Sequence, residues 1–174
     1  MGTAGFTYQE VGATRDMDRP LPAGYHTLRV RTRLGTGGAV QRVAGSAVLN
    51  WRMHRAVLGV TLEPEAREAA PGVGVIVGIG VGRLRLRAPC RVVWTLREAD
   101  RTGWGYGTLP GHPESGEEAF LVERLPDDSV WLTVTAFSRP AVWWTRAAGP
   151  FARWGQRAYA HHCGRALKRL ARAH

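Results

Sequence analysis

The sequence predicts an α+β domain in which a run of strands is followed by one long, basic, amphipathic helix at the C-terminus. Segments of alternating or β-branched residues recur between about residues 25 and 137, and from Phe151 onward apolar residues recur at helical spacing. The chain has 174 residues, 44% of them hydrophobic, which suits one domain with one core. We therefore expect residues 1–24 to form a lead-in packed on the domain and residues 25–174 to form the domain itself.

Charge and cysteine content limit the classes of protein. Eight of the 24 Lys and Arg residues follow Asp128, whereas none of the 14 Asp and Glu residues does, so the basic character belongs to the last segment. No apolar run is long enough for a transmembrane segment, and the N-terminus lacks the pattern of a secretory signal. The two cysteines, Cys90 and Cys163, lack metal-ligand spacing. We expect a cytoplasmic protein with free thiols and with neither a metal nor a cofactor.

The first half of the chain is expected to hold a strand, a helix and a second strand. Residues 25–34 alternate apolar and polar side chains, as in a half-buried strand, and residues 39–57 carry an apolar stripe at helical spacing. The acid-rich residues 62–71 are expected to form a short turn of surface helix. Residues 72–82 indicate a strand bent by its glycines, because a dinucleotide-binding loop needs a third glycine and a following helix.

The second half is expected to hold five strands and the long helix. Pro89 should interrupt the first pair, and the stretch 126–129 has hairpin-turn chemistry; the strands are residues 83–88, 90–98, 102–108, 119–125 and 129–137.

For the helix, Ser138 is the expected N-cap, and Gly149-Pro150 should kink it. The side expected to be buried consists of apolar residues and one histidine, while arginines occupy the other side; the buried set is Phe151, Trp154, Ala158, Tyr159, His162, Cys163, Ala166, Leu167 and Leu170.

Four stretches carry a family resemblance: LNWRMH at 49–54, LRAPCRVV at 86–93, YGTLPGHP at 106–113 with the glutamates that follow, and TAFSRP at 135–140. They resemble the uncharacterised family of domains of unknown function numbered nineteen-ninety. This resemblance, together with the order of the elements, implies the helix-grip, or START-like, fold, in which a curved antiparallel sheet wraps the C-terminal helix and leaves a cavity. It implies small-molecule binding and supplies no catalytic residue.

The polar connection at residues 104–118 is the main candidate for a site. It combines Tyr106, Thr108, His112 and Glu117 with further carboxylates, and a histidine beside carboxylates can act as a general base. The alternative is a hairpin loop whose glycines meet backbone demands and whose acids are solvated. The catalytic residues, if there are any, stay unknown.

Two further sets of residues are weaker candidates. Asn50 and His54, four residues apart on the first helix, could bind a ligand head group if they face the sheet; otherwise they form a solvated pair at the helix edge. Trp94, Trp131 and Phe137 are expected either to line an apolar pocket or to belong to the core.

The leading functional hypothesis is a small-molecule binding protein that holds an apolar or amphipathic ligand between the sheet and the C-terminal helix. An enzyme on the same cavity, cyclase- or hydrolase-like, is one alternative. Another is a protein whose basic helix binds an anionic membrane or nucleic acid. Nucleic acid is the less expected partner, because no nucleic-acid-binding signature accompanies the arginines. A structural or regulatory role with a protein partner is the last alternative; ligand identity and oligomeric state stay open.

Overall fold

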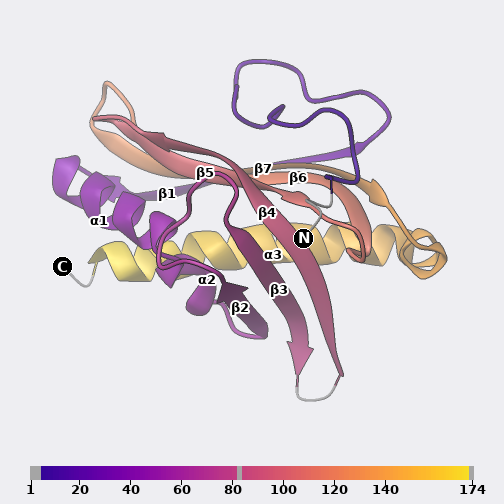
Figure 1. Ribbon diagram of the computed structural model, residues 1–174. Helices are drawn as coiled ribbons and strands as arrows, with labels where there is room; N and C mark the ends of the chain where they lie inside the picture. Colours follow the sequence, from indigo (N-terminus) through magenta and orange to yellow (C-terminus); the bar gives the residue numbers. More distant parts are fainter. Residues whose placement is uncertain (1–4, 82–83, 173–174) are drawn as a thin grey trace.

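The computed structural model describes residues 5–81 and 84–172, and it contains one seven-stranded antiparallel sheet with helices on one face (Figure 1). The strands are β1 His26–Thr36, β2 Val60–Pro64, β3 Gly74–Val81, β4 Leu84–Arg97, β5 Arg101–Thr108, β6 Glu114–Arg124 and β7 Ser129–Pro140. The helices are α1 Gly38–Leu49, α2 Arg52–Arg55 and α3 Trp143–Arg172. The predicted fold class, a sheet closed by a long C-terminal helix, is confirmed.

The sheet order explains why the helices share one face. The order is β1-β7-β6-β5-β4-β3-β2, so the strands from β2 to β7 are antiparallel neighbours in sequence, while β1 pairs with β7 at the far edge. The chain must cross the whole sheet between β1 and β2, and α1 and α2 make that crossing. After β7, α3 returns along the same face (Figure 1). No helix in the described part of the chain has the length and apolar character needed to cross a membrane.

We call the side of the sheet that carries the helices the helix face. Its side chains alternate along each strand with those of the opposite side, as pleating requires. One row across it runs from Val92 through Tyr106 and Glu118 to Ala136, which are register partners on four adjacent strands. Most other residues of this face are apolar and fully or nearly buried, and they include Leu28, Val30, Cys90, Trp104, Phe120, Val122, Leu132 and Val134.

The long helix α3 consists of two parts. Gly149 has φ 27° and ψ −101°, directly before Pro150, so the predicted kink is confirmed. Beyond it, the buried residues are those that contact β1 and α1, and small side chains dominate: Ala160, Cys163, Gly164, Ala166 and Leu167. A Cβ at Gly164 would lie 2.2 Å from the Thr32 hydroxyl oxygen, so this end of α3 packs directly on the strand.

The opposite side of the sheet, which we call the outer face, is covered in part by residues 5–24 (Figure 1). Two glycines of β5 make room for this cover. A Cβ at Gly107 would lie 2.0 Å from the Tyr8 hydroxyl oxygen, and a Cβ at Gly105 would lie 2.5 Å from Trp94 Nε1. The alternation of glycine with aromatic residues in β5 therefore reflects the two faces of one strand.

The predicted helix over residues 39–57 is interrupted. Trp51 has φ 66°, in the left-handed region, and separates α1 from α2. Its ring is completely buried, and its indole N–H donates a hydrogen bond to the carbonyl oxygen of Ala66 at 3.0 Å. Burial of this one large side chain accompanies the break in the helix.

The expected helical turn at residues 62–71 is wrong. Residues 60–64 form β2, which pairs with β3 from Val60↔Ile79 to Pro64↔Val75. Val60 and Leu62 pack against the core with the period of two that a strand gives, and edge pairing leaves Glu63 outside to bind Arg87 at 2.9 Å.

Two strand boundaries also differ from the prediction. Pro89 does not interrupt β4, because it pairs with Ile76 and its carbonyl oxygen accepts a hydrogen bond from the Leu109 N–H at 3.0 Å. Ser138 is not an N-cap, because β7 continues through Pro140 in register with the start of β6. The hairpin turn at residues 126–129 is confirmed, with Asp128 at φ 64°.

The predicted buried stripe of α3 is wrong at its beginning and at His162, which is exposed. Phe151 and Trp154 are 82% and 73% exposed. On a helical wheel they lie far from Cys163 and Leu167, the centre of the buried side, and the sheet covers only that side.

Candidate functional site

A cavity of about 570 Å³ lies between the sheet and the part of α3 near the kink. Its walls come from β2 to β7, from the connection between α2 and β2, and from α3. The apolar part of the lining includes Val57, Val60, Val77, Ala88, Ala136, Ala152 and Ala158. Such a volume and such a lining are typical of sites for small molecules.

The cavity exists because α3 is not packed equally tightly along its length. Next to it, α3 presents Gly155 and Ala158, and a Cβ at Gly155 would meet no atom within 4 Å. At the other end, Gly164 touches β1. Small residues thus permit close contact at one end and leave open space at the other.

Glu118 is the polar centre of the cavity. It belongs to the row on the helix face that includes Tyr106, whose hydroxyl donates a hydrogen bond to Glu118 Oε2 at 2.6 Å. Burial raises the pKa of Glu118 from 4.5 to about 7, and the hydrogen bond from Tyr106 acts in the opposite direction. A carboxylate in this setting can bind a proton or a cation near neutral pH.

Tyr159 supplies a second polar group from α3. Its hydroxyl oxygen is buried and has no hydrogen-bond partner among the described residues, although Tyr159 lines the cavity. Burial, followed by the nearby thiol of Cys163 and the carboxylate of Glu118, raises the pKa of Tyr159 well above 10. The group is therefore a neutral donor and acceptor at physiological pH.

His112 borders the cavity at the start of β6. Its Nδ1 lies 2.9 Å from both the N–H and the carbonyl oxygen of Glu114, so the main chain of Glu114 holds the ring in place. Burial lowers the pKa of His112 from 6.5 to about 4, and burial raises the pKa of Glu114. Near Glu114, the side-chain amide of Gln156 donates to Ser138 Oγ at 3.1 Å, joining α3 to β7.

Thr108 reaches the same end of the cavity but is bound to main chain. Its hydroxyl donates to the Gly116 carbonyl oxygen at 3.2 Å and accepts from the Gly116 N–H at 3.0 Å. It also lies 2.6 Å from the hydroxyl of Thr7. These contacts hold the ends of β5 and β6 to the N-terminal segment.

Glu117 is among the residues that line the cavity, yet its carboxylate points to the outer face. There it accepts hydrogen bonds from the Tyr8 hydroxyl at 2.7 Å, from the Gly12 N–H at 2.7 Å and from the Thr14 N–H at 3.0 Å, and also from the Thr14 hydroxyl. It is 2% exposed. A fully bonded carboxylate between the sheet and its cover is a structural clamp, so we do not place Glu117 among the ligand-contacting groups.

The aromatic candidates lie mostly outside the cavity. The ring of Phe137 packs edge-to-face on Tyr8 at 5.6 Å under the N-terminal segment, although the residue borders the cavity. Trp94 donates its indole N–H to Thr14 Oγ1 at 3.0 Å, on the outer face. Trp131 lies under the guanidinium group of Arg31. Alternation along β7 directs the rings of Trp131 and Phe137 away from α3, and the register shift between Val92 and Trp94 in β4 does the same for Trp94.

Asn50 and His54 do not form a pair. Asn50 is bonded to Ser46 at 3.3 Å on the solvent side. His54 is completely buried between Trp104 and Phe120, with no hydrogen bond at either ring nitrogen in the described structure. Burial lowers its pKa from 6.5 to about 3, so it is a neutral ring of the core. Neither residue lines the cavity.

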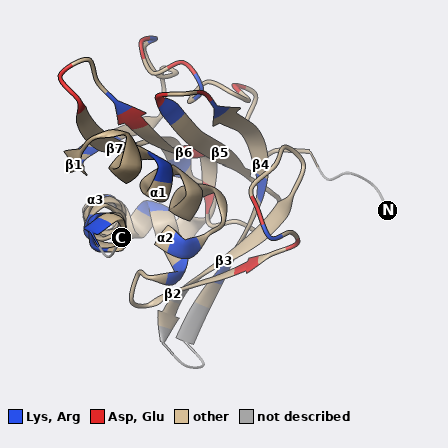
Figure 2. Ribbon diagram, turned by 90° about the vertical axis from the view of Figure 1, so that its left-hand side faces the viewer, with Lys and Arg blue, Asp and Glu red and all other residues tan. Residues whose placement is uncertain are grey.

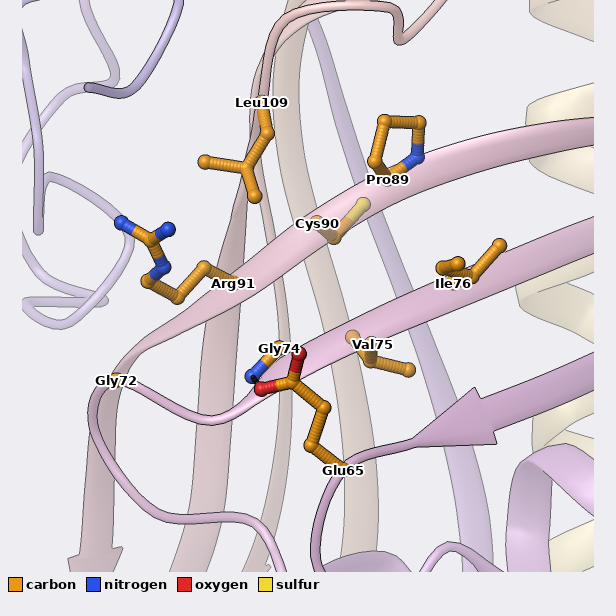
Figure 3. Close-up of a pocket in the computed structure, with 9 residues that line it drawn as sticks. All are labelled: Glu65, Gly72, Gly74, Val75, Ile76, Pro89, Cys90, Arg91 and Leu109. Carbon is orange, nitrogen blue, oxygen red and sulfur yellow. Dashed lines mark hydrogen bonds between the residues drawn. The ribbon is translucent and has the colours of Figure 1, made fainter. Parts of the chain in front are cut away.

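A second hollow, of about 460 Å³, lies where the beginning of β3 pairs with the middle of β4 (Figure 3). Its acid is Glu65, which accepts a hydrogen bond from the Gly74 N–H at 3.0 Å, and the remaining lining comes largely from the two strands and Leu109. None of the predicted site residues lines it. In residues 5–81 and 84–172, no three metal-ligating side chains come together.

Glu118 and Tyr159 are the groups that sequence reasoning missed. Both were visible in principle. Glu118 pairs with Tyr106 across β5 and β6, so the two side chains lie on the same face of the sheet. Tyr159 lies on the side of α3 that was expected to be buried. Without the register, however, the sequence could not distinguish Glu117 from Glu118.

Solved structures share this architecture. The crystal structure of Ara h 8.0201 superposes with a TM-score of 0.60 over 87% of this chain and 100% of its own, at 9% identity. The KanY protein gives a TM-score of 0.61 over 86% and 99%, at 12% identity. Norcoclaurine synthase from Thalictrum flavum, solved with dopamine and hydroxybenzaldehyde, gives 0.58 over 86% and 89%, also at 12%. At these identities the likeness establishes the fold alone, the helix-grip fold of Bet v 1-like proteins.

Sequence relatives are closer. A UPF0548 protein of Deinococcus radiodurans is 36% identical over 174 residues, covering 95% of this chain and 87% of that protein. The UPF0548 protein At2g17695 of Arabidopsis thaliana is 37% identical over 65 residues, covering 37% of this chain and 32% of its own length. The family described as "Domain of unknown function (DUF1990)" matches residues 7–166. This chain therefore belongs to the DUF1990, or UPF0548, family.

Proposed function

We propose that the protein binds a small apolar or amphipathic molecule in the cavity between the sheet and α3. The observation that carries this proposal is an apolar chamber of about 570 Å³ with a few polar groups directed into it. Apolar walls supply most of the free energy of binding, and a few polar groups fix the orientation of the ligand.

The relation between the cavity and the core supports the proposal. Packing usually closes spaces of this size, because each uncovered apolar side chain forgoes contact energy. Here Ala158 and Tyr159 line the space, and the buried hydroxyl of Tyr159 lacks a partner in the described structure. A ligand would supply the missing contacts.

A fold-mate gives independent support. Norcoclaurine synthase from Thalictrum flavum has been solved in complex with dopamine and hydroxybenzaldehyde, two small aromatic molecules. At 12% identity this supports the class of ligand and not its identity. We assign no reaction to this chain.

A titration with the apolar dye N-phenyl-1-naphthylamine tests the proposal. We expect saturable 1:1 binding with increased dye fluorescence. Ala136→Phe and Ala158→Phe each place a ring in the cavity and should weaken binding at least about tenfold. Ala147→Phe, at an exposed position on α3 outside the cavity, is the matched control and should bind normally.

Native mass spectrometry of the purified protein complements the titration, because it would reveal an apolar molecule retained from the host. Thermal unfolding of both cavity variants shows whether they are folded. Failure of the wild-type protein to bind the dye, or unchanged binding by two folded cavity variants, contradicts the proposal.

An anionic membrane surface is a second candidate partner, and exposed aromatic residues beside the cavity favour it. Trp143, Phe151 and Trp154 are 79%, 82% and 73% exposed, and Arg153 and Arg157 are exposed on the same helix. Figure 2 shows the basic positions of α3 in blue. Aromatic and basic side chains together are typical of proteins that rest on anionic membranes.

Vesicle flotation tests this second candidate. Vesicles of phosphatidylcholine with phosphatidylserine should retain the protein at low salt. The Arg153→Glu/Arg157→Glu double variant should lose retention, while Arg42→Glu/Arg55→Glu, at exposed positions on α1 and α2, should keep it. If the vesicles do not retain the protein at low salt, the membrane role is contradicted. Binding of the protein to duplex DNA but not to vesicles contradicts it as well.

A further inference from the structure

Glu118 forms no ion pair with a Lys or Arg in the described part of the chain. Its bonded neighbour is the neutral hydroxyl of Tyr106 at 2.6 Å. The described side chains that line the cavity include neither a lysine nor an arginine. The other carboxylate directed to this end of the cavity is Glu114, which is half-buried.

An ionised carboxylate in such surroundings needs compensation. Removing it from water is costly, and an opposite charge or several hydrogen bonds must offset that cost. Glu117, its neighbour, shows the second solution, with hydrogen bonds from Tyr8, Gly12 and Thr14. Glu118 has one such bond and faces open space.

The surroundings of Glu118 suit a cation better than an anion. The ring of Tyr106 lines the cavity beside Glu118, and aromatic faces attract cations. Across from them, Tyr159 offers a buried hydroxyl with no partner among the described residues. An anionic ligand would meet two carboxylates, and repulsion would oppose its entry.

We propose that the cavity takes an organic cation: an aromatic or apolar amine whose protonated nitrogen pairs with the Glu118 carboxylate, while the Tyr159 hydroxyl bonds a second polar atom of the ligand. This inference rests on the proposed binding function and specifies the chemical class of the ligand. The volume of about 570 Å³ admits a molecule of one to three rings.

Three probes of similar shape separate charge from size: 2-(2-naphthyl)ethylamine, 2-(2-naphthyl)ethanol and 2-naphthylacetate. Isothermal titration of the full chain at pH 7.5 should give an amine affinity at least about tenfold above that of the alcohol. The acetate should bind most weakly. Glu118→Gln, which keeps the size and an acceptor for Tyr106, should lower amine affinity at least about tenfold and change alcohol affinity less than about threefold.

Glu123→Gln is the matched control, because it removes an acid from the same strand outside the cavity and should leave all three affinities unchanged. Alcohol binding equal to amine binding, with no effect of Glu118→Gln, overturns the amine inference and leaves the cavity function intact. If none of the three probes binds, both proposals fail. Circular dichroism of each variant confirms that it is folded.

Discussion

Glu117 and Glu118 are neighbours in the chain, and each accepts a hydrogen bond from a tyrosine, yet their environments are opposite. Glu117 points to the outer face, where Tyr8 and two backbone N–H groups surround it. Glu118 points to the helix face, where Tyr106 is its bonded partner and a cavity lies beyond. One carboxylate is sealed by the protein's own chain, and the other has space for a ligand.

The difference shows that the cover over a strand decides the role of an acid on it. The segment that includes Gly12 and Thr14 brings main-chain donors to the outer face, because loops carry N–H groups that no ladder uses. A helix such as α3 bonds its own main chain and can offer only side chains. Among the described residues, the recorded hydrogen-bond donor to Glu118 is therefore a side chain, the hydroxyl of Tyr106.

The largest expected effect comes from replacing each acid by alanine. Glu117→Ala leaves the hydroxyl of Tyr8 and the amides of Gly12 and Thr14 buried without partners, and should lower the free energy of unfolding by about 4 kcal/mol. Glu118→Ala loses one hydrogen bond and should cost about 1 kcal/mol or less. Urea unfolding of the two variants measures the difference.

Limited proteolysis adds a local measurement to this pair. Glu117→Ala should expose residues 5–24 to cleavage, while Glu118→Ala should leave them protected. Equal loss of stability in both variants would contradict the assignment of clamp and site to the two faces.

The elements of the fold could largely be predicted, because they depend on local periodicity. The alternation in β1 and β7, the turn before Ser129 and the kink at Gly149 are sequence-local, and all are present. The break at Trp51 and the strand at residues 60–64 could not be predicted, since burial of one indole and pairing with a distant strand determine them.

The site was harder to predict from the sequence than the fold. The connection at residues 104–118 was a sound candidate, because Tyr106, Thr108 and His112 do border the cavity. The choice of Glu117 over Glu118 required the register of β5 with β6, and a shift of one residue reverses the faces. The outward ring of Trp131 follows from the alternation in β7, whereas that of Trp94 depends on the register shift after Val92, which the sequence does not reveal.

The second prediction concerns pH, because burial raises the pKa of Glu118 from 4.5 to about 7. Between these values the folded protein holds more protons than the unfolded chain, so stability falls as pH rises through this window. The stabilisation of wild type relative to Glu118→Gln should therefore be greatest below pH 4.5 and lost above pH 7. The change is on the order of 3 kcal/mol.

The difference in the free energy of unfolding between wild type and Glu118→Gln cancels the contributions of other titrating groups. The groups that face Glu118 are Cys90 on β4, Tyr106 on β5, and Tyr159 and Cys163 on α3, and burial raises the pKa of each, so all stay neutral in this window.

Two histidines titrate in the opposite sense, because burial lowers the pKa of His54 to about 3 and of His112 to about 4. Both remain in the variant, so their contribution cancels in the difference. A wild-type-minus-variant difference that stays constant between pH 4.5 and 7.5 contradicts a buried, unpaired Glu118.

The third prediction tests the packing of residues 5–24 on the outer face. Gly107→Ala would place a Cβ 2.0 Å from the Tyr8 hydroxyl oxygen, so the N-terminal segment must shift away from Glu117. Overpacking of this kind costs about 2 kcal/mol, and proteolysis within residues 5–24 should become faster. Gly72→Ala is unsuitable as a control because φ is 90° there; Gly5→Ala, with no atom within 4 Å, should change neither measurement.

The smallest expected effect concerns the part of α3 that borders the cavity. Gly155 lies within α3 at the cavity, and its Cβ would meet no atom within 4 Å. Gly155→Ala should raise the free energy of unfolding by about 0.5–1 kcal/mol, because alanine loses less backbone entropy in a helix. Gly164→Ala, in the same helix, should instead destabilise the protein, since its Cβ would lie 2.2 Å from the Thr32 hydroxyl oxygen. Thermal unfolding that moves in the same direction for both variants would mean that α3 is equally packed at its two ends, and the space facing Glu118 would then be closed.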